Sequence, residues 1–331
     1  MKQIIEQLLD GQNLTCNQAY ETMESIMSGR YSDPQIAGFL IALRAKGETV
    51  EEIVGFAQAM REKMVVVSLS TPAIDLCGTG GDVRGTFNIS TAAAFVVAGA
   101  GVKVAKHGNR SMTSKSGSAD VLQALGIPIH QPPEKAVADV EQSGLGFFFA
   151  PDYHPAMKYA VGARKALATR TVFNLLGPLC NPAQVRSQIM GISQANFIEV
   201  QARALQALGA DEALVFHGQD GLDELSTTAN TTVYQVRDGK TIHSFELDAR
   251  NLGLPRANLK DLAGGTPEEN ASIIRSILTG VKGPKREIVL LNAAAGIVVG
   301  KRANDLLQGL EMAAESVDSG AALQILNWLA Q

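Results

Sequence analysis

The stretch DLCGTGGDVRGTFNIST, residues 75–91, is rich in glycine and small hydroxyl residues around Asp82 and Arg84. An apolar strand candidate, residues 74–77, precedes its glycines, and a helix candidate, residues 90–100, follows them. A strand that passes through a glycine loop into a helix presents unhindered backbone N–H groups and a helix N-terminus to an anion. The stretch therefore predicts an α/β fold with a phosphate site at this turn.

Two familiar nucleotide motifs do not fit this loop. The dinucleotide fingerprint matches Gly78 and Gly80 but meets Val83 where its third glycine belongs. The P-loop pattern matches Gly80 and Gly85 but meets Phe87 where a hydroxyl residue belongs. We therefore expect a phosphate cradle of neither type.

Polar residues lie where the following helix should begin. Asn88, Ser90 and Thr91 have the side chains of helix caps, and in isolation a cap is the favoured interpretation. Because they follow a strand and a glycine loop, we favour a phosphate cradle in which capping is a by-product.

Short apolar strands alternate with helices from residue 74 onward, which predicts a mainly parallel central sheet flanked by helices. The strand candidates are residues 74–77, 102–105, 127–129, 146–149, 213–216 and 288–291, with an antiparallel hairpin over 232–245 that turns at Asp238-Gly239. The helix candidates are residues 90–100, 119–125, 134–143, 196–208, 267–278 and 303–316, and a last helix that ends at 328–330.

Residues 1–68 predict a small helical domain, and residues 69–331 a large α/β domain. Thr15 and Thr49 each begin a capping box, and Asp33 is expected to cap the helix between them. This helical region contains no cluster of metal-binding residue types, so we interpret it as a scaffold or a surface for subunit contact.

The composition favours a soluble globular protein. The chain has 331 residues, 46% hydrophobic and 19% charged, and its apolar runs fall short of a membrane span. The net charge of −4 provides no general attraction to nucleic acid or anionic lipid, so any anion site must be local. The N-terminus lacks the layout of a secretion signal, and we expect a cytoplasmic protein. Cys16, Cys77 and Cys180 indicate neither a disulfide framework nor a metal site.

A second loop, KHGNRSMTSKSGSAD (residues 106–120), contains four basic side chains among many hydroxyl groups. Charge runs are usually solvated, but this loop also follows a strand candidate, and ligands of open α/β sheets collect at that edge. Together the two loops could hold a ligand with two separated phosphate groups.

The adjacent acids Asp223 and Glu224 follow the strand candidate at residues 213–216. Paired carboxylates on a loop are most often solvated. Beside a phosphate site, however, they are the hard oxygen ligands that magnesium prefers, and Ser90 could supply a further oxygen.

Arg164 and Arg170 lie on or near one predicted helix, and the planar guanidinium suits recognition of a carboxylate. A surface salt bridge is the alternative for either arginine. His107 and His154 can be interpreted as ordinary histidines with satisfied hydrogen bonds. Neither is assigned a role in proton transfer.

The motifs GTGGD, FNIST, KHGNR, SKSGSAD, HPAMK, RTVFNLLGPLCNP, DGLDE and LNAAAGIVVG occur in this order. Across nearly the whole chain they resemble the anthranilate phosphoribosyltransferases of tryptophan biosynthesis. The resemblance implies a homodimer of two-domain subunits with the fold of pyrimidine nucleoside phosphorylases. It also implies that a segment near residues 165–185 joins the helical domain.

The resemblance further implies a pentosyltransferase that joins 5-phosphoribosyl 1-diphosphate (PRPP) to anthranilate with release of diphosphate, with Mg²⁺ as cofactor and two ions in each active site. Anthranilate would contact Gly78, Asn109 and Arg164, and magnesium would contact Ser90, Asp223 and Glu224. By matched motif, PRPP would contact Gly78, Gly81, Asp82, Thr86, Asn88, Ile89, Ser90, Thr91, Lys106, His107, Gly108, Asn109, Arg110, Ser111, Met112, Thr113, Ser114 and Ser118.

Two alternatives remain open at this point. A nucleoside phosphorylase of the same fold would bind phosphate and a pyrimidine nucleoside, although GTGGD together with KHGNR speaks against it. A non-catalytic relative that binds nucleic acid should have a basic groove and a degraded glycine loop, whereas this chain is acidic and retains Asp223 and Glu224.

Overall fold

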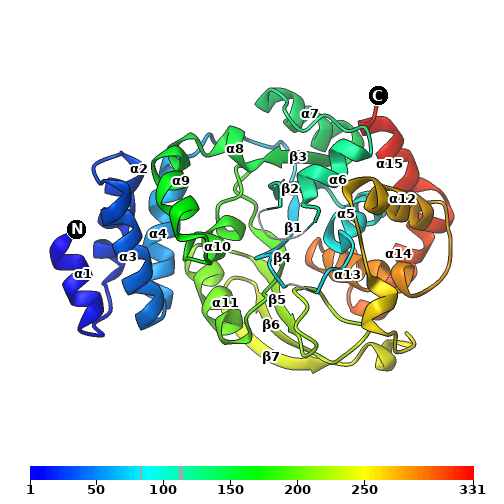
Figure 1. Cartoon of the computed structure of the whole chain (residues 1–331). Helices are drawn as coiled ribbons and strands as arrows, with labels where there is room; N and C mark the ends of the chain where they lie inside the picture. The colour runs from blue at the N-terminus through cyan, green and yellow to red at the C-terminus, as the bar shows by residue number, and fades with distance from the viewer. Residues whose placement is uncertain (83, 112–114) are drawn as a thin grey trace.

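The computed structural model describes residues 1–82, 84–111 and 115–331. Figure 1 shows a group of N-terminal helices beside a central sheet, with the C-terminal helices on the far side of that sheet. The N-terminal helices are α1 (Lys2–Leu9), α2 (Cys16–Met27), α3 (Asp33–Lys46) and α4 (Val50–Lys63).

The strands are β1 (Ile74–Gly78), β2 (Val104–Gly108), β3 (Leu145–Phe149), β4 (Ser187–Gly191), β5 (Glu212–Gly218), β6 (Thr231–Arg237) and β7 (Thr241–Leu247). The other helices are α5 (Ile89–Gly99), α6 (Ser118–Ala124), α7 (Pro133–Ser143), α8 (Ala150–Tyr153), α9 (Lys158–Leu167), α10 (Phe173–Leu176), α11 (Ile198–Ala207), α12 (Pro267–Leu278), α13 (Pro284–Val299), α14 (Leu306–Asp318) and α15 (Ala321–Leu329).

The seven strands form one sheet in the order β3-β2-β1-β4-β5-β6-β7. Neighbouring strands from β3 to β5 are parallel, and β6 and β7 are antiparallel. Ile74 of β1 pairs with Val104 on one side and Ser187 on the other, because the chain builds β2 and β3 first and then returns to β4. The strand order thus reverses between β1 and β4, the kind of point at which open α/β sheets bind ligands.

Alternate residues of β5 face two apolar clusters. Leu214 and Phe216 pack with residues of α5 and α13, whereas Ala213 and Val215 pack with residues of α4 and α11. Because a strand places successive side chains on opposite faces, this run supplies both layers of the core. The sheet is consequently covered on both faces, as a mainly parallel sheet requires.

The predicted fold class is confirmed, and so is the hairpin that turns at Asp238-Gly239. The strand predicted at residues 288–291 is wrong, because these residues belong to α13. That helix is buried on nearly all sides, and its apolar run therefore lacks the helical period that would have distinguished it from a strand. The strand predicted at 127–129 is also wrong, since Ile127 and Ile129 fill the core from a turn after α6.

Two further differences concern polar residues. Strand β4 was not predicted, and its buried Gln188 interrupts the apolar pattern. Strand β2 begins later than predicted and continues through Lys106 and His107, which are both buried. Both capping boxes are confirmed, but Ser32 and not Asp33 is the N-cap of α3.

The N-terminal helices share an apolar cluster with later segments of the chain. Ala160 and Ala163 of α9 and Phe173 of α10 belong to the same cluster as Met23 and Phe56. The division of the chain near residue 68 and the inclusion of a segment near residues 165–185 in the helical part stay predictions, because the same cluster also contains residues of the sheet such as Val215. Among the described residues, no helix combines the length and apolar character needed to cross a bilayer.

Helices α2 and α4 approach closely at Gly55, where a Cβ atom would lie 2.2 Å from the carbonyl oxygen of Cys16. We expect Gly55→Ala to lower the free energy of unfolding by about 1–3 kcal/mol through overpacking. Gly38→Ala in α3 is the matched control, because its Cβ would meet only Ile5, at 3.4 Å, and alanine favours helix. Chemical denaturation of both variants checks this, and equal stability of the two would contradict the packing account.

Candidate functional site

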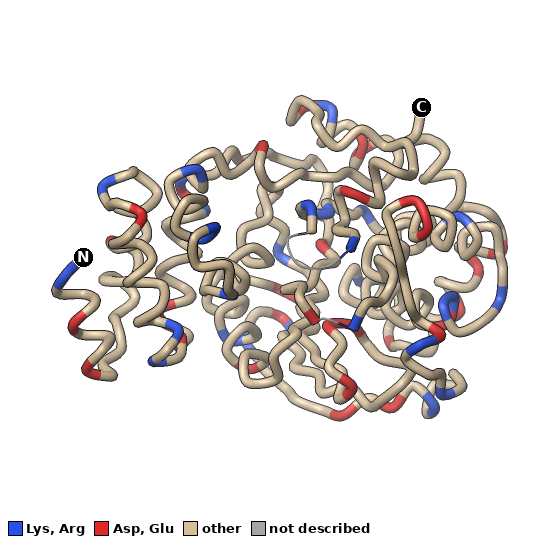
Figure 2. The backbone as a smooth tube through the Cα atoms, in the orientation of Figure 1, with Lys and Arg blue, Asp and Glu red and all other residues tan. Residues whose placement is uncertain are grey.

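The carboxyl ends of β1, β2, β4 and β5 lie at one edge of the sheet. The residues predicted to bind phosphate and metal lie in the loops that follow β1, β2 and β5 or in the ends of the strands and helices beside these loops. Lysines and arginines are interspersed with acids along the whole chain, as Figure 2 shows, so any attraction for an anion must come from local groups.

The glycine loop after β1 has an unusual backbone. Gly80 and Gly81 have φ angles of 66° and 71°, in the left-handed region that suits glycine. The N–H of Gly80 donates a hydrogen bond of 2.8 Å to Oδ2 of Asp223, and Thr79 N–H donates to the carbonyl of Gly191. The glycine loop is therefore bonded to the end of β4 and to the loop that follows β5.

Two glycines make room for Asp223. A Cβ atom on Gly78 would lie 2.6 Å from Oδ2 of Asp223, and one on Gly191 would lie 1.7 Å from its carbonyl oxygen. Gly78 was predicted to contact both substrates. Gly191 was not predicted, because only the sheet order shows that β4 adjoins β1.

The far end of the glycine loop is held by the segment before α12. Thr86 forms an isolated β-bridge with Ala263, and Phe87 N–H donates to the carbonyl of Leu262 at 3.2 Å. The Asn88 side chain accepts hydrogen bonds from Asn270 and Ser116 and donates to the Ser116 carbonyl. Asn88, predicted as a cap or a ligand contact, thus links the loop after β1 to the loop after β2, and Asn270 was not predicted from the sequence.

The loop after β2 is organised around Asp120. Its carboxylate accepts hydrogen bonds from the N–H groups of Ser111 and Gly117 and from the Arg110 guanidinium. The carbonyl of Asn109 accepts from Ser118 Oγ at 3.2 Å. Arg110 therefore supports the loop through Asp120. Three predicted contacts, Met112, Thr113 and Ser114, lie outside the described residues.

The acid pair lies directly against the glycine loop and the start of α5. Glu224 Oε1 accepts a hydrogen bond of 3.1 Å from the Ser90 N–H, while Asp223 accepts from Gly80. Burial, with Asp82 nearby, raises the pKa of Asp223 to about 7. Burial, followed by repulsion from Asp223, raises the pKa of Glu224 well above its usual range.

This arrangement fits a hard divalent cation. Burial keeps both carboxylates costly to ionise even with Arg170 and Lys106 nearby, and the predicted third ligand, Ser90, lies beside Glu224. In the part of the chain that the structure describes, no group of three or more His, Cys, Asp or Glu side chains could hold a metal. The site thus resembles those in which substrate oxygens and waters complete the coordination of Mg²⁺.

Lys106 is a buried cation beneath the glycine loop. Its Nζ donates to the carbonyl of Leu76 and lies 3.5 Å from Oγ of Ser90. Burial lowers the pKa of Lys106, while Asp75 opposes that change. Asp75 accepts from the His107 N–H and from the Asn181 side chain, and burial raises its pKa to about 6. Lys106 is therefore held between a buried acid and the predicted metal site.

His107 and His154 form a buried pair with ring centroids 5.1 Å apart. Burial lowers their pKa values to about 3 and about 4, so both rings are neutral near pH 7. The Nε2 atom of each ring has no hydrogen-bond partner among the described residues. No pattern in the sequence indicated that these two histidines lie together.

Arg164 and Arg170 occupy different positions. Arg164 is half-buried on α9, with its guanidinium 5.1 Å from the centre of the Phe173 ring. Arg170 follows α9 and donates to the carbonyls of Gly80 and Gly81. Each arginine was considered for recognition of a carboxylate, but the structure places them differently, because Arg170 binds the backbone of the glycine loop.

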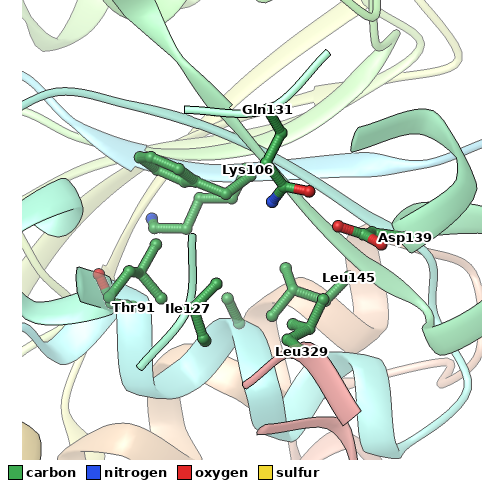
Figure 3. A pocket seen from close by; sticks show the side chains of 10 residues that line it. Thr91, Lys106, Ile127, Gln131, Asp139, Leu145 and Leu329 are labelled. Atoms are coloured by element: carbon green, nitrogen blue, oxygen red, sulfur yellow. The ribbon is translucent and has the colours of Figure 1, made fainter. Parts of the chain in front are cut away.

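A small cavity of about 10 Å³ has Lys106 of the site among its lining residues (Figure 3). Lys106, Thr91 and Gln131 are among its lining residues, and Leu145 and Leu329 close it from the strand and the C-terminal helix. This volume accommodates about one water molecule and no substrate. Thr91, predicted to contact PRPP, is buried at this cavity, and Ile89, another predicted contact, is buried in the core.

The raised pKa of Asp223 predicts a pH dependence of stability. Between about pH 4 and pH 7 the folded protein retains a proton that an unfolded aspartate has lost. The free energy of unfolding therefore falls as pH rises through this window. Between pH 5 and pH 8 in metal-free buffer, we expect the free energy of unfolding of wild type to fall by about 1 kcal/mol or more relative to that of Asp223→Asn. This figure allows for solvent screening.

Urea denaturation at the two pH values measures this difference, with the exposed Glu311→Gln of α14 as the control. Added Mg²⁺ at pH 8 should stabilise wild type more than Asp223→Asn. If the free energies of unfolding of wild type and Asp223→Asn changed with pH in parallel, the pKa of Asp223 would not be raised in the folded protein.

Comparisons with known proteins agree with this geometry. Residues 2–64 match the helical bundle domain of a glycosyl transferase family, and residues 70–323 match its a/b domain. An anthranilate phosphoribosyltransferase from Alkaliphilus metalliredigens is 50% identical over 99% of this chain and 97% of its own length. One from Thermoanaerobacter is 50% identical over 98% of this chain and 96% of its own.

Solved structures give the same result. The anthranilate phosphoribosyltransferase from Thermus thermophilus superposes with a TM-score of 0.93 at 41% identity, covering 99% of this chain and 98% of that one. The Saccharomyces cerevisiae enzyme in complex with PRPP and Mg has a TM-score of 0.90 at 30% identity, over 98% of this chain and 95% of that one. Similarity of this extent along the whole chain shows that the protein belongs to the anthranilate phosphoribosyltransferase family.

Proposed function

We propose that the protein transfers the 5-phosphoribosyl group of PRPP to the amine of anthranilate, giving N-(5′-phosphoribosyl)anthranilate and diphosphate in tryptophan biosynthesis. The observation that carries this proposal is the placement of Asp223 and Glu224 against the N–H groups of Gly80 and Ser90. This placement joins a cation site to a phosphate-binding turn. The yeast relatives in complex with PRPP and Mg and with 4-fluoroanthranilate support it.

Magnesium fits the acid pair, and Asp223, Glu224 and the Ser90 hydroxyl would hold it. When bound, Mg²⁺ would neutralise charge on the diphosphate group. We also propose that a second Mg²⁺ ion binds in each active site. This proposal rests on the resemblance and leaves the roles of the protein side chains unchanged.

The protein's own groups would stabilise separated charge in the reaction. Loss of diphosphate leaves positive charge on C1 of the ribose and adds negative charge to the leaving group. Lys106 and the backbone N–H groups of the glycine loop would stabilise that negative charge. The other proposed PRPP contacts come from the loops after β1 and β2 and from the strand and helix ends beside them. Because the anthranilate amine would itself attack C1, a nucleophilic side chain is not required.

Anthranilate would be oriented by Arg164, Asn109 and Gly78. Burial lowers the pKa of Arg164, but a guanidinium remains cationic in proteins and offers paired donors to a carboxylate. Hydrogen bonds from Arg164 to the carboxylate would orient the amine toward C1 and hold the reacting atoms in one geometry. A homodimer and a cytoplasmic location complete the proposal, and both rest on the resemblance.

A direct assay tests the function. Purified protein mixed with PRPP, Mg²⁺ and anthranilate should remove anthranilate fluorescence, and each mixture lacking one component should not. Phosphate-dependent release of a base from a pyrimidine nucleoside, with no loss of anthranilate, would instead establish the phosphorylase alternative. Tight, salt-sensitive DNA binding without turnover would support the nucleic-acid alternative.

Arg164→Ala should raise the KM for anthranilate by about tenfold to a hundredfold, because a charge-assisted hydrogen bond contributes roughly 1.5–3 kcal/mol. The KM for PRPP should change little. Steady-state kinetics with each substrate varied in turn measure both constants, and Arg164→Lys should fall between wild type and Arg164→Ala. An unchanged KM for anthranilate would refute the assigned role.

A further inference from the structure

Arg170 makes contacts that the proposed reaction does not yet explain. Its guanidinium donates hydrogen bonds to the carbonyls of Gly80 and Gly81, at 2.9 and 3.0 Å, and to Oγ of Ser193 at 2.7 Å. Ser193 follows β4 and in turn meets Thr79 of the glycine loop, with their hydroxyl oxygens 3.1 Å apart. One side chain thus fixes two successive peptide groups of the glycine loop.

The planarity of the peptide bond gives these contacts a consequence. In a trans peptide the carbonyl of one residue and the N–H of the next point in opposite directions. When Arg170 holds the carbonyls of Gly80 and Gly81, it directs the N–H groups of Gly81 and Asp82 away from itself. Among the described residues, no acceptor is bonded to either N–H. Two adjacent free donors of this kind form a concavity suited to an anion.

A second set of contacts holds Arg170 from the helical side. Nη1 of Arg44, on α3, donates at 2.6 Å to the carbonyl of Arg170 and at 2.6 Å to Oγ1 of Thr169. Helices α9 and α10, which flank this segment, lie between the N-terminal helices and the sheet (Figure 1). A chain of hydrogen bonds therefore runs from α3 through Arg170 to the glycine loop.

We propose that Arg170 is a positioning residue: it orients the peptide groups of Gly80 and Gly81 so that the loop presents N–H donors to the diphosphate of PRPP. Arg44 holds Arg170 in place and so couples the helical part of the chain to that loop. This inference rests on the proposed function for the identity of the anion. It differs from the sequence-based hypothesis, in which Arg170 would bind a carboxylate.

The test compares Arg170→Gln and Arg170→Lys with Arg203→Gln, a control on the exposed face of α11. Arg170→Gln should raise the KM for PRPP by about tenfold or more while the KM for anthranilate stays within about threefold of wild type. Arg170→Lys, which can still bind one carbonyl, should recover part of the loss. Arg203→Gln should match wild type.

Titration calorimetry with PRPP and Mg²⁺ provides a readout that does not need turnover. If wild type binds PRPP but does not consume anthranilate, the proposed function fails while the role of Arg170 is still tested by binding. A raised KM for anthranilate with an unchanged KM for PRPP would overturn the inference, and so would a lower kcat with both KM values unchanged.

Arg44→Ala keeps the proposal testable if the Arg170 variants do not fold. Like Arg170→Gln, it should weaken PRPP binding, by about twofold to fivefold. In a folded double variant with Arg170→Gln, the two effects should be less than multiplicative, because Arg44 acts through Arg170. Unchanged PRPP binding in Arg44→Ala would contradict the coupling to α3.

Discussion

The arrangement of the molecule depends on two hydrogen bonds, from the N–H of Gly80 to Asp223 and from the N–H of Ser90 to Glu224. They bring adjacent carboxylates from the loop after β5 to the predicted phosphate-binding turn and to a helix N-terminus after β1. Without a cation, burial makes both carboxylates costly to ionise, as their raised pKa values show. Two buried carboxylates of this kind favour a bound cation, and the anionic oxygens of a ligand can complete the coordination of that cation.

The surrounding packing keeps the acid pair in position. The side chain of Asn292, fully buried in α13, accepts from the N–H of Leu225 and donates to its carbonyl, each at 3.0 Å. Glycines at the ends of β1 and β4 leave the room that Asp223 needs. Asn292 of α13 therefore fixes the residue that follows Glu224 and helps to hold the acid pair in place.

The sequence predicted the local features of the fold and most of the candidate site. Glycine loops, capping boxes and adjacent acids are contiguous in the chain, so their chemistry can be deduced without knowledge of the tertiary structure. Contacts between distant residues could not be deduced in this way. Asn270 meets Asn88 across 182 positions, and Gly191 meets Asp223 only because β4 adjoins β1. Helix α13 was mistaken in part for a strand because a fully buried helix has no polar face.

A crystal structure with PRPP and Mg²⁺ tests the central claim most directly. The account predicts the diphosphate within hydrogen-bonding distance of the N–H groups of Gly81 and Asp82, with the metal on Asp223 and Glu224. A sugar phosphate bound away from both loops, with these N–H groups making no contact to it, would contradict it.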